Sequence, residues 1–180
     1  GMKSLGDDGL LRLVAGELER DGFRLVGAHE ILGDLAVEDG ILGKVKPDDQ
    51  AVSDAQHGLN VARILGAADV GQGCVVQQGL VLALEAIEGT DEMIRRSADY
   101  RREGVGGVLV KSAKPQQDRR LDLPAIGVST VENAHNAGLR GIALLAGGTM
   151  IIDREKTVKR ADELGLFIIG LSVQEPAQND

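Results

Sequence analysis

Apolar residues recur at helical spacing in five segments of the chain. In the first of them, Leu10, Val14 and Leu18 fall on one face of a helix. Asp7 and Asp8 lie in its first turn, where the positive end of a helix dipole favours acids. This pattern predicts helices over residues 7–21, 53–65, 90–100, 129–137 and 153–164.

Several of these helices begin at residue types that commonly cap helix N-termini. Ser53 is followed three positions later by Gln56, and Ser129 by Glu132, which is the spacing of a capping box. The predicted N-caps are Ser53, Thr90, Ser129 and Asp153.

Short apolar runs alternate with the helices. They predict strands over 23–28, 74–84 (interrupted at 77–79), 105–110, 125–128, 141–145, 149–152 and 166–171, with a loop carrying one or two short strands over 29–47. This alternation indicates an α/β fold with a mostly parallel or mixed central sheet flanked by helices. Ligands of such folds bind at the carboxyl ends of the strands, where the residues from Lys111 and from Ser129 onward are expected.

Composition narrows the class of protein. The chain has 180 residues, of which 43% are hydrophobic and 27% charged, as in one soluble globular domain. Its net charge of −8 and its few aromatic residues argue against binding of nucleic acid. One cysteine and the lack of any apolar run of about 20 residues favour a cytoplasmic protein.

Familiar site motifs fail on inspection. Residues 71–76 begin like a dinucleotide-binding fingerprint, but they lack its third glycine and enter a strand instead of a helix. Cys74 lies in that β-rich run and is expected to be a buried small hydrophobe. The three histidines are far apart in sequence and form no zinc motif.

A basic loop over residues 111–124 follows a predicted strand in this otherwise acidic chain. Lysine and arginine donors suit the oxygens of a pyrophosphate. Asp122 could ligate a divalent cation or orient a water molecule. A solvated loop without function explains the same composition. The four basic residues are Lys111, Lys114, Arg119 and Arg120.

A second candidate segment, residues 85–91, places carboxylates and a hydroxyl between a strand and a helix start. Such oxygen ligands suit magnesium, and the helix N-terminus could instead hold a phosphate. Capping by Thr90, with Asp91 and Glu92 matching the helix dipole, explains the same residues structurally.

These segments carry a resemblance to a known family. The sequence "EGTD" together with "KSAKPQQDRRLDLPAIG" closely resembles the carboxy-terminal domain of the UDP-2,3-diacylglucosamine pyrophosphatases of lipid A biosynthesis, of the type unrelated to calcineurin. The likeness runs from about residue 6 to residue 171. It implies magnesium-dependent hydrolysis, with Mn²⁺ as an alternative ion, of UDP-2,3-diacylglucosamine to UMP and 2,3-diacylglucosamine 1-phosphate.

The resemblance also implies roles for individual residues. The essential aspartate of the family's "DLP" triplet corresponds to Asp122, which we expect to be catalytic and to bind the metal together with Asp91. The expected substrate-binding residues are Lys111, Lys114, Gln117, Arg119 and Thr90.

Family members carry an amino-terminal Rossmann-like domain, to which nothing in this chain corresponds. We therefore expect residues 1–22 to form a lead-in helix and residues 23–180 the catalytic domain. The expected partners are the UDP-lipid, its lipid product, the absent domain and the inner face of the inner membrane as a peripheral contact. Two alternatives stay open: a non-catalytic phosphate- or nucleotide-binding module, and an assembly domain that forms a homodimer through its first helix.

Overall fold

The computed structural model describes residues 7–24, 36–115 and 123–173. The helices are α1 (Asp7–Arg20), α3 (Asp49–Ala67), α4 (Gly89–Ser97), the 3₁₀ helix η1 (Ala98–Tyr100), α5 (Val128–Asn136) and α6 (Arg154–Leu164). The strands are β1 (Gly40–Ile41), β2 (Gly73–Gln77), β3 (Leu80–Leu84), β4 (Val108–Lys111), β5 (Ala125–Ile126), β6 (Gly141–Leu145), β7 (Met150–Ile151) and β8 (Phe167–Leu171). The predicted strand over 23–28 is not found at residues 23 and 24, and its remainder lies outside the described residues.

The central sheet has six strands in the order β1-β8-β6-β4-β2-β3. Its middle strands β4, β6 and β8 run parallel, whereas β1, β2 and β3 pair antiparallel with their neighbours. The sheet is therefore mixed, in agreement with the prediction of a mostly parallel or mixed sheet. Strands β5 and β7 pair separately as a short parallel ladder.

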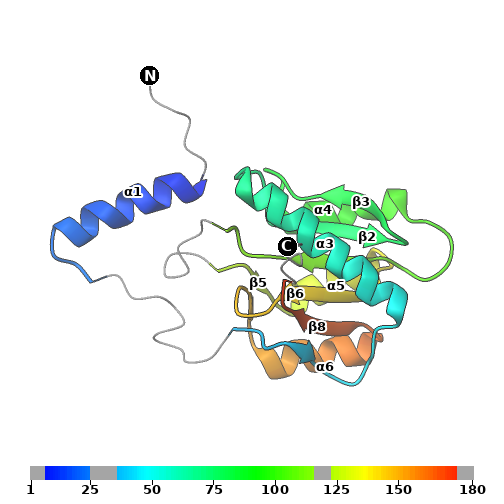
Figure 1. Cartoon of the computed structure of the whole chain (residues 1–180). Coiled ribbons are helices and arrows are strands. Elements are labelled where there is room, and N and C mark those ends of the chain that lie inside the picture. Colours follow the sequence, from blue (N-terminus) through cyan, green and yellow to red (C-terminus); the bar gives the residue numbers. More distant parts are fainter. Residues whose placement is uncertain (1–6, 25–35, 116–122, 174–180) are drawn as a thin grey trace, which may run out of the picture.

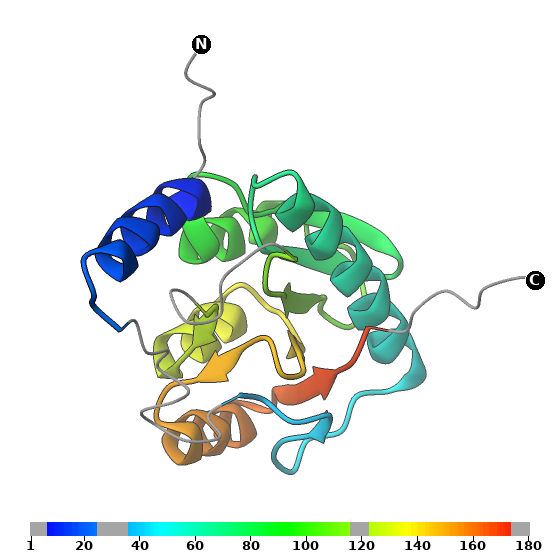
Figure 2. The same cartoon turned by 60° about the vertical axis from the view of Figure 1, so that its left-hand side comes forward.

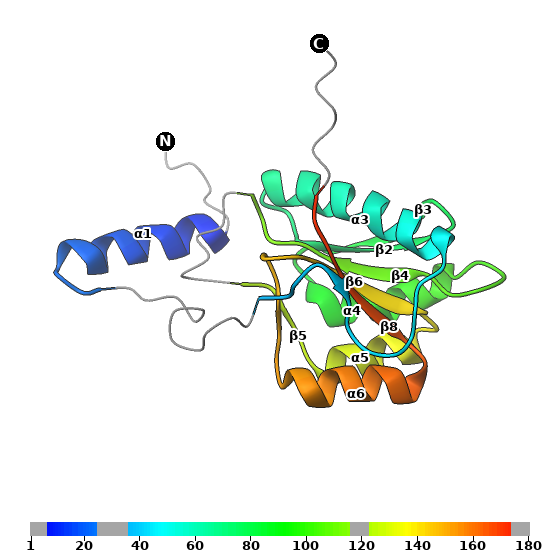
Figure 3. The ribbon, with the colours of Figure 1, turned by 60° about the horizontal axis from the view of Figure 1, so that its bottom comes forward.

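Helices cover both faces of the sheet. Helix α3 lies on one face, and α4, α5 and α6 form a row on the other (Figures 1, 2 and 3). Each face has its own buried apolar cluster, built almost entirely from Val, Ile, Leu and Ala, as the scarcity of aromatics predicts. The α/β prediction is confirmed.

Alternation along β4 decides which side chains enter which cluster. Val108 and Val110 pack toward α3, whereas Leu109 packs in the cluster on the side of α4. Because side chains alternate along a strand, Lys111 at the end of β4 also points to the α4 side. The sheet thus delivers a lysine to the space beneath the start of α4.

The starts of α3 and α5 differ from the predicted capping boxes. Helix α3 begins before Ser53, because the side chain of Asp48 accepts a hydrogen bond from the N–H of Ala51 at 2.8 Å. Helix α5 has Gly127 as its N-cap, and Ser129 lies within its first turn. Both capping-box predictions are wrong.

The starts of α4 and α6 show what their expected caps do instead. Thr90 lies inside α4, and its hydroxyl is bonded elsewhere. Asp153 does occupy the N-cap position of α6, but its side chain makes no capping hydrogen bond. Of the four predicted caps, only Asp153 has the right position.

Candidate functional site

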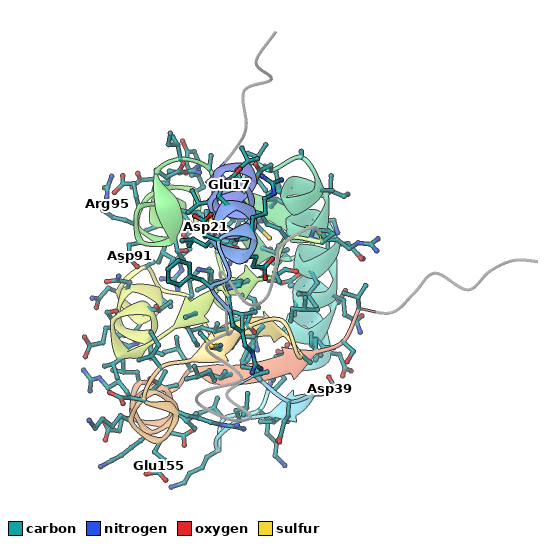
Figure 4. The ribbon with its side chains drawn as sticks, turned by 90° about the vertical axis from the view of Figure 1, so that its left-hand side faces the viewer. Glu17, Asp21, Asp39, Asp91, Arg95 and Glu155 are labelled. Carbon is teal, nitrogen blue, oxygen red and sulfur yellow. The ribbon has the colours of Figure 1, made fainter. Side chains whose placement is uncertain are left out.

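One edge of the sheet gathers the ends of several strands. The parallel strands β4, β6 and β8 all end there, and β2, which is antiparallel to β4, begins there with Gly73 opposite Lys111. The chain also leaves β3 at this edge and passes through residues 85–88 into α4. Helix α1 lies on the same side of the molecule (Figures 1 and 4). Both candidate segments of the sequence therefore begin at one edge.

Lys111, Thr90 and Glu85 form a hydrogen-bonded chain at this edge. The ammonium of Lys111 donates to Thr90 Oγ1 at 2.7 Å, and the hydroxyl of Thr90 donates to Glu85 Oε1 at 3.0 Å. Lys111 is only 5% exposed and Glu85 only 7%. The second carboxylate oxygen, Glu85 Oε2, is buried without a hydrogen-bond partner.

Two glycines make room for Glu85. A Cβ atom on Gly71 would lie 2.0 Å from the carbonyl oxygen of Glu85, and one on Gly73 would lie 2.5 Å from Glu85 Oε2. No other residue type fits at these positions without moving the backbone or the carboxylate. Gly71 and Gly73, the two glycines of the sequence that resembles a dinucleotide-binding fingerprint, thus allow the start of β2 to lie close to the residue that follows β3.

The segment between β3 and α4 is held by an ion pair. Arg96 of α4 bonds Glu88 at 2.6 Å and also donates to the carbonyl oxygen of Leu84. The hydrogen bond from Arg96 lowers the pKa of the Glu88 carboxyl below its ordinary value. Backbone hydrogen bonding adds to this hold, since Glu85 N donates to the carbonyl oxygen of Gly73 at 2.9 Å.

Lys114 leaves the same edge three residues after Lys111. Its ammonium pairs with Asp69 Oδ1 at 2.6 Å, just beyond the end of α3. The side chains are 13% and 25% exposed, so the pair is partly shielded from water. This contact fixes the start of the basic loop against α3.

Asp91 takes a different direction from its neighbour Thr90. Its carboxylate accepts a hydrogen bond from Asn133 of α5 at 3.1 Å, beside a cavity of about 340 Å³ between α4 and α5. Figure 4 shows it near Arg95 on the outer flank of α4. Among the described residues there is no group of three acidic, histidine or cysteine side chains arranged to hold a metal ion.

The expected catalytic residue Asp122, together with Gln117 and Arg119, lies outside the described residues. The described ends of the loop are Lys111 to Pro115 at the sheet edge and Leu123 with Pro124, whose carbonyl oxygen accepts from Met150 N at 2.9 Å. Of the expected site residues, the structure brings Lys111 and Thr90 into contact.

The link through Glu85 was not deduced from the sequence. In the sequence, Glu85 and Lys111 are 26 positions apart and belong to two separate candidate segments. The order β4-β2-β3 at the edge of the sheet makes the ends of β3 and β4 near neighbours. A predicted hairpin over 73–84 paired antiparallel with the next strand would have revealed this proximity.

Comparison with known proteins gives two findings. A family model described as "LpxI C-terminal domain" matches residues 38–169. A protein of Caulobacter vibrioides named "UDP-2,3-diacylglucosamine pyrophosphatase LpxI" is 49% identical over 176 residues. The match covers 94% of this chain and 63% of that protein, so the chain spans less than two thirds of its relative's length.

Proposed function

The chain belongs to the family of LpxI C-terminal domains, and from that premise we propose that it carries the catalytic part of a UDP-2,3-diacylglucosamine pyrophosphatase. Water would cleave the pyrophosphate to give UMP and 2,3-diacylglucosamine 1-phosphate. The observation that carries the proposal is the 49% identity to the Caulobacter enzyme over 94% of this chain.

The geometry of the sheet edge supports this reaction. Pyrophosphate cleavage needs positive charge that is already in place where negative charge develops. Lys111 offers a buried ammonium at the carboxyl end of β4, with its direction fixed by Thr90. Lys114 begins the same loop, and we propose that both lysines and Arg119 bind phosphate oxygens.

Magnesium fits the proposal as a metal bound jointly by protein and substrate. Mg²⁺ commonly takes one or two carboxylates together with phosphate oxygens and water. The described residues offer one unpartnered buried carboxylate oxygen at this edge, Glu85 Oε2, and no three-ligand cage. We propose that the metal is held chiefly by Asp122 and the substrate, with Mn²⁺ as an alternative ion. The ion would offset pyrophosphate charge and polarise phosphorus.

Replacing the expected catalytic aspartate tests the proposal. We expect Asp122→Ala to abolish UMP release while leaving the melting temperature nearly unchanged, because the change removes a functional carboxylate from a polar loop. UMP release from UDP-2,3-diacylglucosamine, followed by chromatography, measures the effect. Asp99→Ala, an exposed aspartate in η1, is the matched control and should retain activity. Hydrolysis that survives loss of Asp122 would contradict the assigned role.

A non-catalytic phosphate- or nucleotide-binding module is the competing function. It is favoured by the buried lysine, which offers a phosphate a fixed positive charge without a metal. Such a module would bind UMP or pyrophosphate equally well with magnesium and with a chelator. It would release no UMP from the lipid substrate, so one assay with and without EDTA separates the two functions.

The environment of the enzyme follows from the proposed substrate. In the part of the chain that the structure describes, no helix is both long and apolar enough to span a membrane. We propose a cytoplasmic enzyme that meets its two-chain lipid at the inner face of the inner membrane. We propose that an amino-terminal domain of the kind expected from the resemblance would cover the substrate from the other side.

A further inference from the structure

The chemistry of three side chains determines the direction of the two hydrogen bonds that link Lys111 to Glu85 through Thr90. An ammonium can only donate hydrogen bonds, and an ionised carboxylate can only accept them. The single hydroxyl hydrogen of Thr90 is given to Glu85 Oε1 at 3.0 Å. The oxygen of Thr90 is thereby turned to accept from Lys111 Nζ at 2.7 Å. Glu85 thus sets the orientation of a hydroxyl that in turn sets the position of an ammonium.

Glu85, at the end of this series of hydrogen bonds, is held in place by contacts on both sides of it. Glu85 is fixed by its backbone bond to Gly73, and the ion pair of Arg96 with Glu88 closes the segment that follows it. Thr90 lies on the first turn of α4, and Lys111 ends a buried strand. All three groups are carried by ordered secondary structure or by segments tied to it, which is what precise placement of a charge requires.

Glu85 differs from Asp54, the other buried carboxylate of this part of the fold, in how fully its oxygens are bonded. Asp54 is also buried, and its two oxygens accept from Gln78 N at 2.8 Å, Gly79 N at 2.7 Å and Gln50 Nε2 at 3.0 Å. The carboxylate of Asp54 therefore stabilises the turn between β2 and β3. Glu85 supports one hydroxyl and leaves Oε2 without a partner, an arrangement that does not maximise stability.

We propose that Glu85 is a positioning residue, which acts through Thr90 to hold the Lys111 ammonium where it meets a phosphate group of a nucleoside diphosphate derivative. The inference rests on the proposed function and adds to it a residue that does not itself touch the substrate. It predicts that loss of the Glu85 charge or of the Thr90 hydroxyl weakens the hold on Lys111, and that the two losses are not additive.

Chemical modification tests the hold on Lys111 without any need for turnover. The chain is treated briefly with acetic anhydride, and acetylation of each lysine is measured by mass spectrometry. We expect Lys111 to react about tenfold faster in Glu85→Gln, in Thr90→Val and in the double variant alike, because its placement depends on both groups. Lys114, which pairs with Asp69, should react at an unchanged rate and serves as the internal comparison.

Matched controls separate positioning from general loosening of the fold. Thr157→Val removes the hydroxyl of another buried helix threonine, which donates to the carbonyl oxygen of Ile152 at 2.7 Å. Glu132→Gln removes the charge of a glutamate paired with Arg160 at 3.0 Å. Neither should change the acetylation of Lys111. An unchanged rate at Lys111 in Glu85→Gln, or an equal rise in these controls, overturns the inference.

Kinetics test whether the reaction uses the held ammonium. We expect Glu85→Gln and Thr90→Val to lower kcat for UMP release by about tenfold to a hundredfold with little change in KM, since a displaced group costs most in the transition state. Thr90→Ser retains the hydroxyl and should recover most of the rate. Normal kcat in Glu85→Gln would overturn the positioning role while leaving the proposed function intact.

Failure of the proposed function gives a different result. If the parent chain releases no UMP, inorganic pyrophosphate serves as the probe for Lys111. Protection of Lys111 from acetylation by pyrophosphate in the parent chain, and its loss in Glu85→Gln, supports the inference. Equal protection in both chains overturns it.

Discussion

Cys74 shows how burial alters the chemistry of a single side chain. It lies fully buried under α3, with its sulfur 3.4 Å from the carbonyl oxygen of Gly58. Burial, together with the smaller effect of the negative charge of Glu85, raises the pKa of the thiol to about 12. Because the thiolate is the reactive form, this cysteine is no nucleophile. The expectation of a small buried hydrophobe is confirmed.

The reactivity of Cys74 can be measured directly. We expect iodoacetamide at about pH 8 to leave the folded chain unmodified, since a thiol with a pKa near 12 forms almost no thiolate there. Mass spectrometry should find full modification once guanidinium has unfolded the chain. Rapid labelling of the folded chain would show that the thiol is accessible and would contradict the described packing.

Helix starts illustrate the limits of local patterns at the scale of elements. Asp48 begins α3 because it serves two partners at once: the N–H of Ala51 and the guanidinium of Arg140, 2.6 Å away. Arg140 precedes β6 and is distant in sequence, so no local rule identifies it. The capping box at Ser53 satisfies the sequence pattern equally well but lies within the helix that results.

The charge of Asp48 at the start of α3 should make the stability of the fold depend on pH. The hydrogen bond from Arg140, with that from Ala51 N, lowers the pKa of Asp48 below its ordinary value of 3.8. A lowered carboxyl pKa contributes stability that is present above the ordinary value and is lost as pH falls through the folded-state value. Asp48→Asn keeps a capping oxygen but removes the charge facing Arg140.

We therefore expect the parent chain to be more stable than Asp48→Asn by a constant margin above about pH 5, and this margin to shrink below about pH 4. Urea unfolding followed by circular dichroism across this range measures the margin. Asp99→Asn, which changes an exposed aspartate without an ion-pair cap, should show no such trend. A margin that persists at the lowest pH would contradict the role of the charge.

At the scale of the whole molecule, α1 stands out because part of its apolar face is exposed. Its helix was predicted correctly, but Val14 and Leu18 on its apolar face are 51% and 37% exposed. Leu13 and Phe23 are more than half exposed as well. The helix lies on the side of the molecule at which β4, β6 and β8 end (Figures 1 and 4). The predicted homodimer would use this face.

A solution mass measurement tests the homodimer. We expect the parent chain to sediment as a dimer and the double variant Val14→Asp, Leu18→Asp as a monomer, because two charges would be placed in an apolar contact. The melting temperature at low concentration should change little, since both side chains are exposed in the single chain. A parent chain that is monomeric at every concentration removes the self-association hypothesis.

The sequence by itself determined the type and approximate bounds of most elements, as at β6, where the predicted and observed ranges coincide. Such patterns depend on spacings of two to four residues, which a short window contains. The sequence also determined the family, because its motifs are contiguous. Asp122, the centre of the predicted chemistry, follows from that resemblance and stays a prediction.

Only the tertiary structure decided which strand ends meet. A strand's own pattern shows that it is buried but not which neighbour it pairs with, and pairing is settled by the packing of the whole sheet. The antiparallel pairing of β2 with both β3 and β4 carries Glu85 to the edge where Lys111 ends its strand. Thr90, expected as a cap, thereby bridges a buried carboxylate and a buried ammonium.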